Sequence, residues 1–257
     1  MPPLKKKFMK LILRFIVAIF FFSCSKSSSN EANFAGTSGK GGSLARFTIV
    51  GNYLYTVDKE NLKVFDITAP SKPAFKRSIP VGFEIETIFP FKDKLFIGST
   101  SVVHIFSIDD PANPQKLSEA VSRTVMRRCD PVVAKDTVAY ATLRTNGECG
   151  GTASILAVYD IRDIKNPVQR TSRPVTEPYG LGYSGNTLYV CDKQAGIMVY
   201  DITKAFDPVF IRSVLTTNGY FIDVIPYDNI LVCWASNGMT LYDISNPQTP
   251  TLIKHID

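Results

Sequence analysis

The sequence predicts an all-β fold, a five-bladed β-propeller with four antiparallel strands per blade. The first observation behind this prediction is a phrase that recurs five times: an aromatic, an acidic or hydroxyl residue, an isoleucine, and a proline eight residues after the aromatic. Successive aromatics are 41, 53, 41 and 42 residues apart, and a period of this length indicates a repeat architecture. The copies are Phe65–Pro73, Phe106–Pro114, Tyr159–Pro167, Tyr200–Pro208 and Tyr242–Pro250.

The second observation is that each repeat contains two near-continuous apolar runs, such as Leu54–Val57 and Leu62–Ile67. Runs of this kind predict strands that are buried on both faces, as in a blade between two neighbouring blades. Less apolar segments on either side complete four strands in about 40–45 residues, the size of a propeller blade. A turn pair precedes the second strand of each unit: Gly51-Asn52, Lys92-Asp93, Lys135-Asp136, Gly185-Asn186 and Tyr227-Asp228.

The recurring acidic residue and proline have a structural interpretation. An aspartate at a strand end accepts a hydrogen bond from a backbone N–H two residues on, and the proline fixes φ where the chain turns. Ser107, which replaces the aspartate in the second unit, can make a weaker version of the same bond.

The five units fall at about residues 44–82, 83–123, 124–176, 177–217 and 218–257. The chain begins on an innermost strand and ends on an outermost one, so no strand is left to complete the last blade with residues from the other end. Unless Asn33–Ser38 pairs with a sheet edge, we expect the ring to close by packing of the first blade on the fifth, which is a weaker seam.

The units resemble a known family. Gly185–Val190 followed by Gly196–Ile202, and Gly51–Tyr55 followed through Leu62–Ile67, are similar to the LVIVD repeat. The resemblance covers about residues 44–257 and is weakest in the second and third units. It implies a propeller on an exported or surface protein of bacteria or archaea, and it transfers no catalytic residue.

The N-terminal segment, residues 1–24, reads as a lipoprotein signal: a basic start, an apolar run over Leu11–Phe22, and then Ser23-Cys24. We expect Cys24 to be lipidated and to become the mature N-terminus. An uncleaved anchor or an ordinary signal peptide is the alternative, and Met9 is an alternative start. Residues 25–43, rich in Ser, Gly and Asn, are expected to form a flexible linker. The predicted location is the bacterial outer membrane or cell surface, with the periplasmic side left open.

Most of the net charge of +6 comes from this signal segment. Five of the 29 basic residues lie within residues 1–23, which leaves 24 against 23 acidic residues in the rest. A chain near neutrality has no electrostatic footprint for nucleic acid, so we expect no nucleic-acid partner. A monomer is expected.

The third unit carries about 12 extra residues around Arg144–Gly151. Cys149 in this insertion and Cys129 are expected on the same face of the propeller, where an exported protein can join them in a disulfide. Cys191 and Cys233 are expected at the same place in adjacent units, too far apart to bridge, as buried apolar thiols.

The chain has only two histidines, and we predict neither a metal site nor a cofactor. The candidate ligand-binding residues instead surround the channel mouth on the face that bears the insertion. Aromatic, guanidinium and carboxylate groups together suit a polar ligand such as a glycan or a peptide terminus, and a solvated rim of paired charges is the alternative. The candidates are Arg46, Glu84, Glu86, Arg127, Arg128, Tyr179, Tyr220 and Asp223.

These observations favour a membrane-anchored, non-enzymatic scaffold that binds a protein or glycan partner, with Arg144–Gly151 as one wall of the site beside Arg127, Arg128 and Tyr179. The alternative is a propeller enzyme, a hydrolase or lyase acting on sugars. An enzyme needs titratable groups that converge in the central funnel. The candidates for that role are Glu84, Glu86, Asp130 and Asp223.

Overall fold

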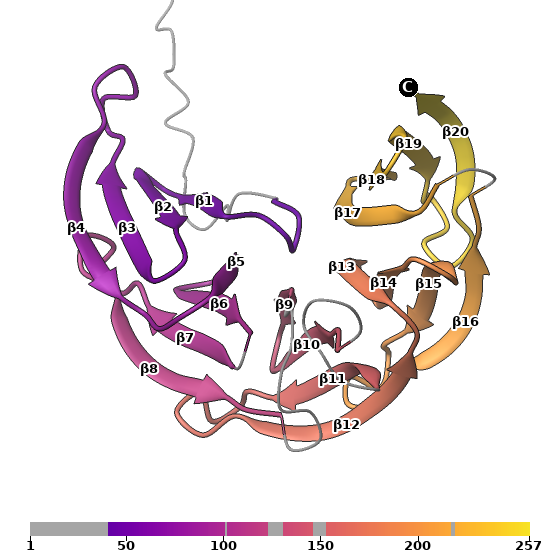
Figure 1. The fold of residues 1–257 in the computed structure, drawn as a ribbon, viewed down its shortest axis with the longest axis horizontal. Coiled ribbons are helices and arrows are strands. Elements are labelled where there is room, and N and C mark those ends of the chain that lie inside the picture. The colour runs from indigo at the N-terminus through magenta and orange to yellow at the C-terminus, as the bar shows by residue number, and fades with distance from the viewer. Residues whose placement is uncertain (1–40, 101, 123–130, 146–152, 217–218) are drawn as a thin grey trace, which may run out of the picture. The chain divides into compact units, whose positions relative to one another are not determined.

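The computed structural model describes residues 41–100, 102–122, 131–145, 153–216 and 219–257. These residues form five four-stranded antiparallel sheets and no helix, so the predicted five-bladed propeller is confirmed. In Figure 1 the five sheets follow one another in chain order around a common axis. Within the described residues, no helix is long and apolar enough to span a membrane. The predicted signal segment and most of the predicted linker lie outside the described residues.

Each blade is a meander whose strands pair in chain order from the innermost to the outermost. The first two blades contain β1 (Phe47–Val50), β2 (Tyr53–Val57), β3 (Asn61–Asp66), β4 (Ala74–Pro80), β5 (Ile85–Phe91), β6 (Lys94–Ser99), β7 (Val103–Ser107) and β8 (Gln115–Ala120). The third and fourth contain β9 (Val132–Lys135), β10 (Val138–Leu143), β11 (Ser154–Asp160), β12 (Val168–Val175), β13 (Pro178–Ser184), β14 (Thr187–Asp192), β15 (Gly196–Asp201) and β16 (Val209–Val214). The fifth contains β17 (Phe221–Tyr227), β18 (Ile230–Ala235), β19 (Gly238–Asp243) and β20 (Thr251–Ile256).

The turn between the first and second strand of every blade contains one residue with positive φ. These residues set a common frame for the repeat and are Gly51, Lys92, Asp136, Gly185 and Asp228. In this frame Cys191 lies six residues after its turn residue and Cys233 lies five after its own. The expectation that the two cysteines occupy the same place was therefore wrong by one residue. They line one apolar cluster between the fourth and fifth blades, where both are buried free thiols.

The aspartate of the recurring phrase has the predicted structural role. Asp66 Oδ1 accepts a hydrogen bond from the backbone N–H of Thr68 at 2.9 Å, and the aspartates of the third, fourth and fifth blades accept the equivalent bond. In the second blade the Ser107 hydroxyl accepts it from Asp109 N at 3.1 Å. These side chains shape the turn into the outer strand in all five blades.

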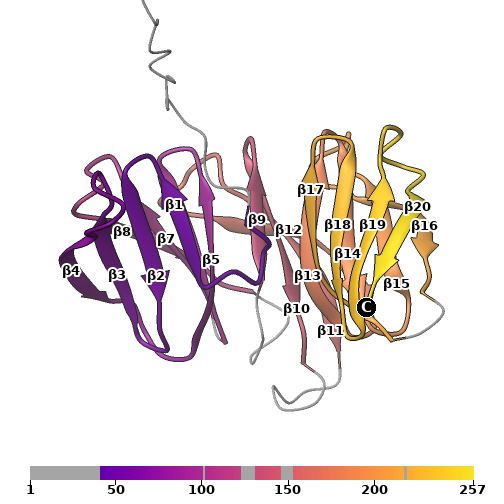
Figure 2. The same cartoon turned by 90° about the horizontal axis from the view of Figure 1, so that it is seen from above.

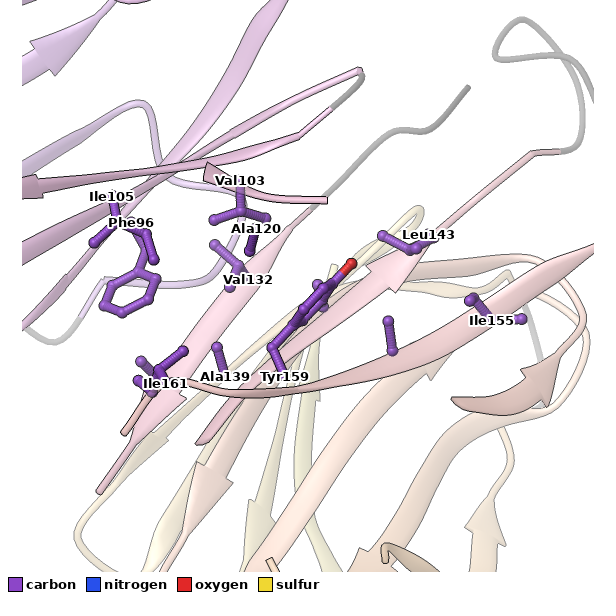
Figure 3. Close-up of a cluster of buried hydrophobic side chains, with 13 residues drawn as sticks. Phe96, Val103, Ile105, Ala120, Val132, Ala139, Leu143, Ile155, Tyr159 and Ile161 are labelled. Carbon is purple, nitrogen blue, oxygen red and sulfur yellow. The ribbon is translucent and has the colours of Figure 1, made fainter. Parts of the chain in front are cut away.

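Adjacent blades pack through apolar clusters. Figure 3 shows side chains from the second and third blades, among them Phe96, Val132 and Tyr159, which meet in one buried cluster. The strands that supply them are buried on both faces, as the near-continuous apolar runs predicted: every residue of β7, β10 and β11 is buried.

A tyrosine on the second strand adds a hydrogen bond between blades. The hydroxyl groups of Tyr55, Tyr140 and Tyr189 donate to the carbonyl oxygens of Pro111, Ala205 and Pro247 of the following blade, at 2.8, 2.8 and 2.7 Å. These three tyrosines hold the same position in the repeat. The repeat therefore couples each of these blades to its successor by a polar as well as an apolar contact.

The first and fifth blades do not close the ring in the way that the sequence predicted. The facing surfaces of these blades keep large apolar side chains in solvent, with Phe47 60% and Trp234 56% exposed. The link between the two ends lies instead near the axis. There the Ser43 hydroxyl donates to Asp223 Oδ1 and Leu44 N donates to Asp223 Oδ2, both at 3.1 Å.

Candidate functional site

The candidate site lies on the face of the propeller that carries two sets of loops: those joining one blade to the next, and those joining the second to the third strand within a blade. We call it the Tyr179 face. In a meander both sets emerge on the same side, and Figure 2 shows the blades edge-on with their strands running between the two faces. The predicted channel mouth belongs to this face.

Two tyrosines from neighbouring blades form the centre of the site. Tyr179 belongs to β13 and Tyr220 directly precedes β17, and their ring centroids lie 5.5 Å apart at an interplanar angle of 37°. The Thr142 hydroxyl donates a hydrogen bond to the Tyr179 carbonyl oxygen at 2.7 Å. The Ser236 hydroxyl accepts one from Tyr220 N at 3.1 Å. Both aromatic residues are therefore fixed through their backbones by side chains of a neighbouring strand or loop.

A positively charged side chain lies over each of the two tyrosine rings. The Arg144 guanidinium carbon lies 4.2 Å from the centroid of the Tyr179 ring, and Lys193 Nζ lies 5.3 Å from that of Tyr220. Both distances are within the range of a cation–π interaction. The Lys193 ammonium also pairs with the Glu177 carboxylate at 3.0 Å, and this hydrogen bond raises the pKa of Lys193. Tyr179 and Tyr220 are thus flanked by the positive charges of Arg144 and Lys193.

Arg144 is the residue with spare donor capacity. Its Nε is buried and has no hydrogen-bond partner among the described residues. A buried donor of a charged group is costly to leave unsatisfied. Because Arg144 is also the first residue of the predicted insertion, the start of that insertion lies on the Tyr179 ring.

Two carboxylates, Glu84 and Glu86, also interact with the charged groups around Arg144. Burial raises the pKa of Glu86, the charges of Arg144 and Arg46 oppose that rise, and the charge of Glu84 adds to it. Glu84 accepts a hydrogen bond from the Thr100 hydroxyl at 2.6 Å. Within the described part of the chain, no group of three or more His, Cys, Asp or Glu side chains could hold a metal ion.

Asp223 does not take part in the channel mouth. Only 6% of its surface is exposed, and its two carboxylate oxygens accept hydrogen bonds from Ser43, Leu44 and the backbone N–H of Val224. Gly42 and Gly180 pack so closely on this carboxylate that a Cβ at either would lie about 2 Å from one of its oxygens. The structure therefore gives Asp223 a structural role in place of the predicted ligand contact.

The other predicted site residues divide into three groups. Tyr179 and Tyr220 are in contact, and Arg46, Glu84 and Glu86 interact electrostatically beside Arg144. Arg127, Arg128, Cys129, Asp130 and Cys149 lie outside the described residues. The sequence reasoning missed Lys193 and Glu177, although both stand in loops that the repeat places on this face.

Exposed apolar side chains surround the same face. Phe83 is 78% exposed in the loop that joins the first blade to the second. Val121 and Leu215 are also exposed and lie in the loops that leave the second and fourth blades. The Tyr179 face therefore combines aromatic and cationic groups at its centre with apolar groups in the surrounding loops.

The fold is that of a β-propeller built from sequence repeats. The LVIVD repeat family model matches residues 41–80, 181–216 and 231–257, which belong to the first, fourth and fifth blades. These segments are similar to LVIVD repeats, in agreement with the resemblance seen in the sequence. A search of curated proteins finds no significant sequence match.

Solved structures share the fold at low sequence identity. A protein from Lactobacillus plantarum has a TM-score of 0.65 and 14% identity, over 80% of this chain and 72% of that one. The periplasmic gluconolactonase PpgL of Pseudomonas aeruginosa has a TM-score of 0.57 and 14% identity, over 80% and 67%. Apo AztD of Citrobacter koseri has a TM-score of 0.58 and 12% identity, over 80% and 60%. The chain thus spans less than two thirds of the length of AztD, and these likenesses concern the fold alone.

Proposed function

We propose that the protein is a membrane-anchored extracytoplasmic lipoprotein whose propeller is a non-enzymatic scaffold for a protein partner, bound on the Tyr179 face through an acidic segment. The observation that carries the proposal is the contact of Arg144 with the Tyr179 ring, which itself packs on Tyr220, beside exposed apolar loops. Tyrosine and arginine are enriched among the residues that dominate the binding energy of protein interfaces.

The chemistry of the partner follows from Arg144. The Arg144 guanidinium has an unpartnered buried Nε among the described residues, while Lys193 is already paired with Glu177. A carboxylate is the acceptor that best matches a guanidinium. Exposed Phe83 and Leu215 favour a protein surface over a small polar ligand, because a partner protein can cover apolar loops at a distance from the ring pair.

Among the described carboxylates, Asp223 does not support the enzyme alternative. Asp223 is held by Ser43 and Leu44 in a buried position, so it cannot pair with Glu84 or Glu86 across the mouth. One fold neighbour is a gluconolactonase, which shows that the fold can host an enzyme and transfers no active site to this chain.

The proposal is tested with defined probes on the full chain in detergent. We expect hexaglutamate to bind, hexaglutamine not to bind, and Arg144→Ala and Tyr220→Ala each to weaken hexaglutamate binding by about tenfold or more. Lys72→Ala, an exposed charge change on the opposite face, serves as the matched control and should leave binding unchanged. Binding of an acidic glycan such as hexagalacturonate without binding of hexaglutamate, or equal binding by all variants, would overturn the protein-partner proposal.

A further inference from the structure

The first and fifth blades each present one face that no other blade covers. In Figure 1 the sheet β1–β4 and the sheet β17–β20 are the first and last of the series, and each has a neighbouring sheet on one side. We call the uncovered side of the first blade its leading face and that of the fifth blade its trailing face. The leading face includes Phe47 and Ile49, and the trailing face includes Ile230, Trp234 and Met239.

Phe47 occupies a position of the repeat that is buried in the other four blades. Four residues before the positive-φ turn residue, the other four blades have Ile88, Val132, Leu181 and Val224, which are at most 1% exposed because the preceding blade covers them. Phe47 is the fifth member of this set and is 60% exposed.

Trp234 is the counterpart of Phe47 on the other uncovered face. Six residues after the turn residue, the first, third and fourth blades have Val57, Thr142 and Cys191, which are buried against the next blade. Trp234 is 56% exposed at the same position. Moving a tryptophan and a phenylalanine side chain from water into an apolar interface is favourable. We therefore expect both uncovered faces to bind another apolar surface.

The interfaces between blades show which surfaces fit together. Cys191 and Val224 lie in one apolar cluster between the fourth and fifth blades, and Val57 and Ile88 lie in one cluster between the first and second. In the frame of the repeat, Cys191 and Val57 correspond to Trp234, and Val224 and Ile88 correspond to Phe47. A trailing face therefore packs on a leading face, with these two positions in the same core.

The two uncovered faces of one chain do not satisfy each other. Ser43 and Leu44 join the two ends only through Asp223, near the axis, and Phe47 and Trp234 remain exposed with that link in place. We propose that a second copy of this chain covers them: the trailing face of one copy packs on the leading face of the other, with Trp234 against Phe47 of its partner. This contact covers the trailing face of one copy and the leading face of the other.

The proposal is tested by cross-linking two differently tagged full chains in detergent, one with Phe47→Cys and the other with Trp234→Cys. The parent chain gives the background from the native thiols. We expect oxidation of the mixture to yield a linked pair that carries both tags, at a level about tenfold or more above either variant oxidised alone. Val209→Cys, an exposed position on the outer strand β16, is the matched control and should not link to Phe47→Cys.

A charge on either face provides a second measurement. Trp234→Asp and Phe47→Asp should each weaken self-association by about tenfold or more in sedimentation experiments, whereas Val209→Asp should not. A monomer at all concentrations, or equal linkage of two Trp234→Cys chains, would overturn the proposal. So would a chain carrying both cysteines that links only within itself, since its own faces would then close the seam.

Discussion

The Ser43 hydroxyl donates a hydrogen bond to Asp223 Oδ1 at 3.1 Å across 180 residues of sequence. The same hydroxyl accepts a hydrogen bond from Leu181 N at 2.7 Å. One buried side chain ahead of the first blade thus contacts the innermost strands of the fourth and fifth blades. This link, more than any contact between the outer strands, connects the two ends of the blade series.

Replacing Ser43 should show how much that link contributes to the free energy of unfolding. Ser43→Ala removes the donor to Asp223 and leaves the Leu181 N–H without its acceptor in a buried position, which costs roughly 1–3 kcal/mol. Urea denaturation should show this loss in the free energy of unfolding. Ser71→Ala, at an exposed loop position, is the control with no expected change, and equal stability of the two variants would contradict the assigned role.

Asp223 makes stability depend on pH. Burial raises the pKa of Asp223 to about 6, whereas an unfolded aspartate has a pKa of about 3.9. Because the folded-state pKa is the higher one, folding favours the neutral carboxyl. Its contribution is fully present below about pH 4 and is lost as the pH rises through about 6, by an amount on the order of 3 kcal/mol.

The measurement for Asp223 is a comparison with Asp223→Asn, because other carboxylates titrate in the opposite sense. The pKa of Asp160, for example, is held low by Arg162. The difference in unfolding free energy between parent and variant should shift against the parent between pH 4 and pH 7. A difference that is constant over this range would show that burial does not raise the pKa of Asp223.

The tyrosine hydroxyl groups between blades should each contribute measurably. Tyr189→Phe removes the hydrogen bond to the Pro247 carbonyl oxygen and should lower the free energy of unfolding by about 1 kcal/mol. Phe96, which occupies this position in the second blade, shows that the ring alone fits there. Tyr53→Phe, a change of another tyrosine in the first blade, is the control and should have little effect on the free energy of unfolding. If Tyr189→Phe also left it unchanged, the hydrogen bond would contribute no net stability.

The two cysteines of the fourth and fifth blades should be inert in the folded protein. Cys191 and Cys233 are fully buried, and burial raises the pKa of both thiols, so the reactive thiolate is scarce. Alkylation followed by peptide mass spectrometry should label both only after unfolding in urea. Rapid labelling of either in the native protein would mean that the interface between these blades opens.

Much of the fold follows from local pattern. The aspartate of the recurring phrase and the apolar runs act over a few residues, and each is found where the sequence indicates it. Three of the predicted turn pairs also agree, whereas the turns of the third and fifth blades begin one residue later than predicted, at Asp136 and Asp228. The closure could not be predicted in the same way, because it depends on Ser43 and Asp223, which no periodicity connects. The equivalence assigned to Cys191 and Cys233 failed because the positive-φ residue is the first of the turn pair in one blade and the second in the other.

The candidate site was predictable in part for the same reason. Tyr179 and Tyr220 precede or begin inner strands, and the repeat alone brings such positions together. Lys193 was not foreseen, because its contact with Tyr220 depends on how the loop after β14 is folded around Asp192, which accepts hydrogen bonds from the N–H groups of four residues in the two loops that flank it.

The anchoring proposal depends on Cys24. Mass spectrometry of the membrane-extracted protein should show a mature chain that begins with an acylated Cys24, and Cys24→Ser should shift the protein from the membrane to the soluble fraction. A single acyl chain gives only marginal binding, whereas two or more anchor stably. An unmodified N-terminus at another residue would contradict this part of the proposed function.

The claim that the Tyr179 face binds a protein partner is tested most directly by site-specific photo-cross-linking in cells that produce the chain. A photoreactive phenylalanine derivative is placed at Tyr220 on this face, or at Thr68, an exposed residue on the opposite face. We expect protein adducts from the Tyr220 position that are absent from the Thr68 position, and we expect Arg144→Ala to reduce them. Absence of adducts at Tyr220, or the same adducts from both positions, would contradict the account.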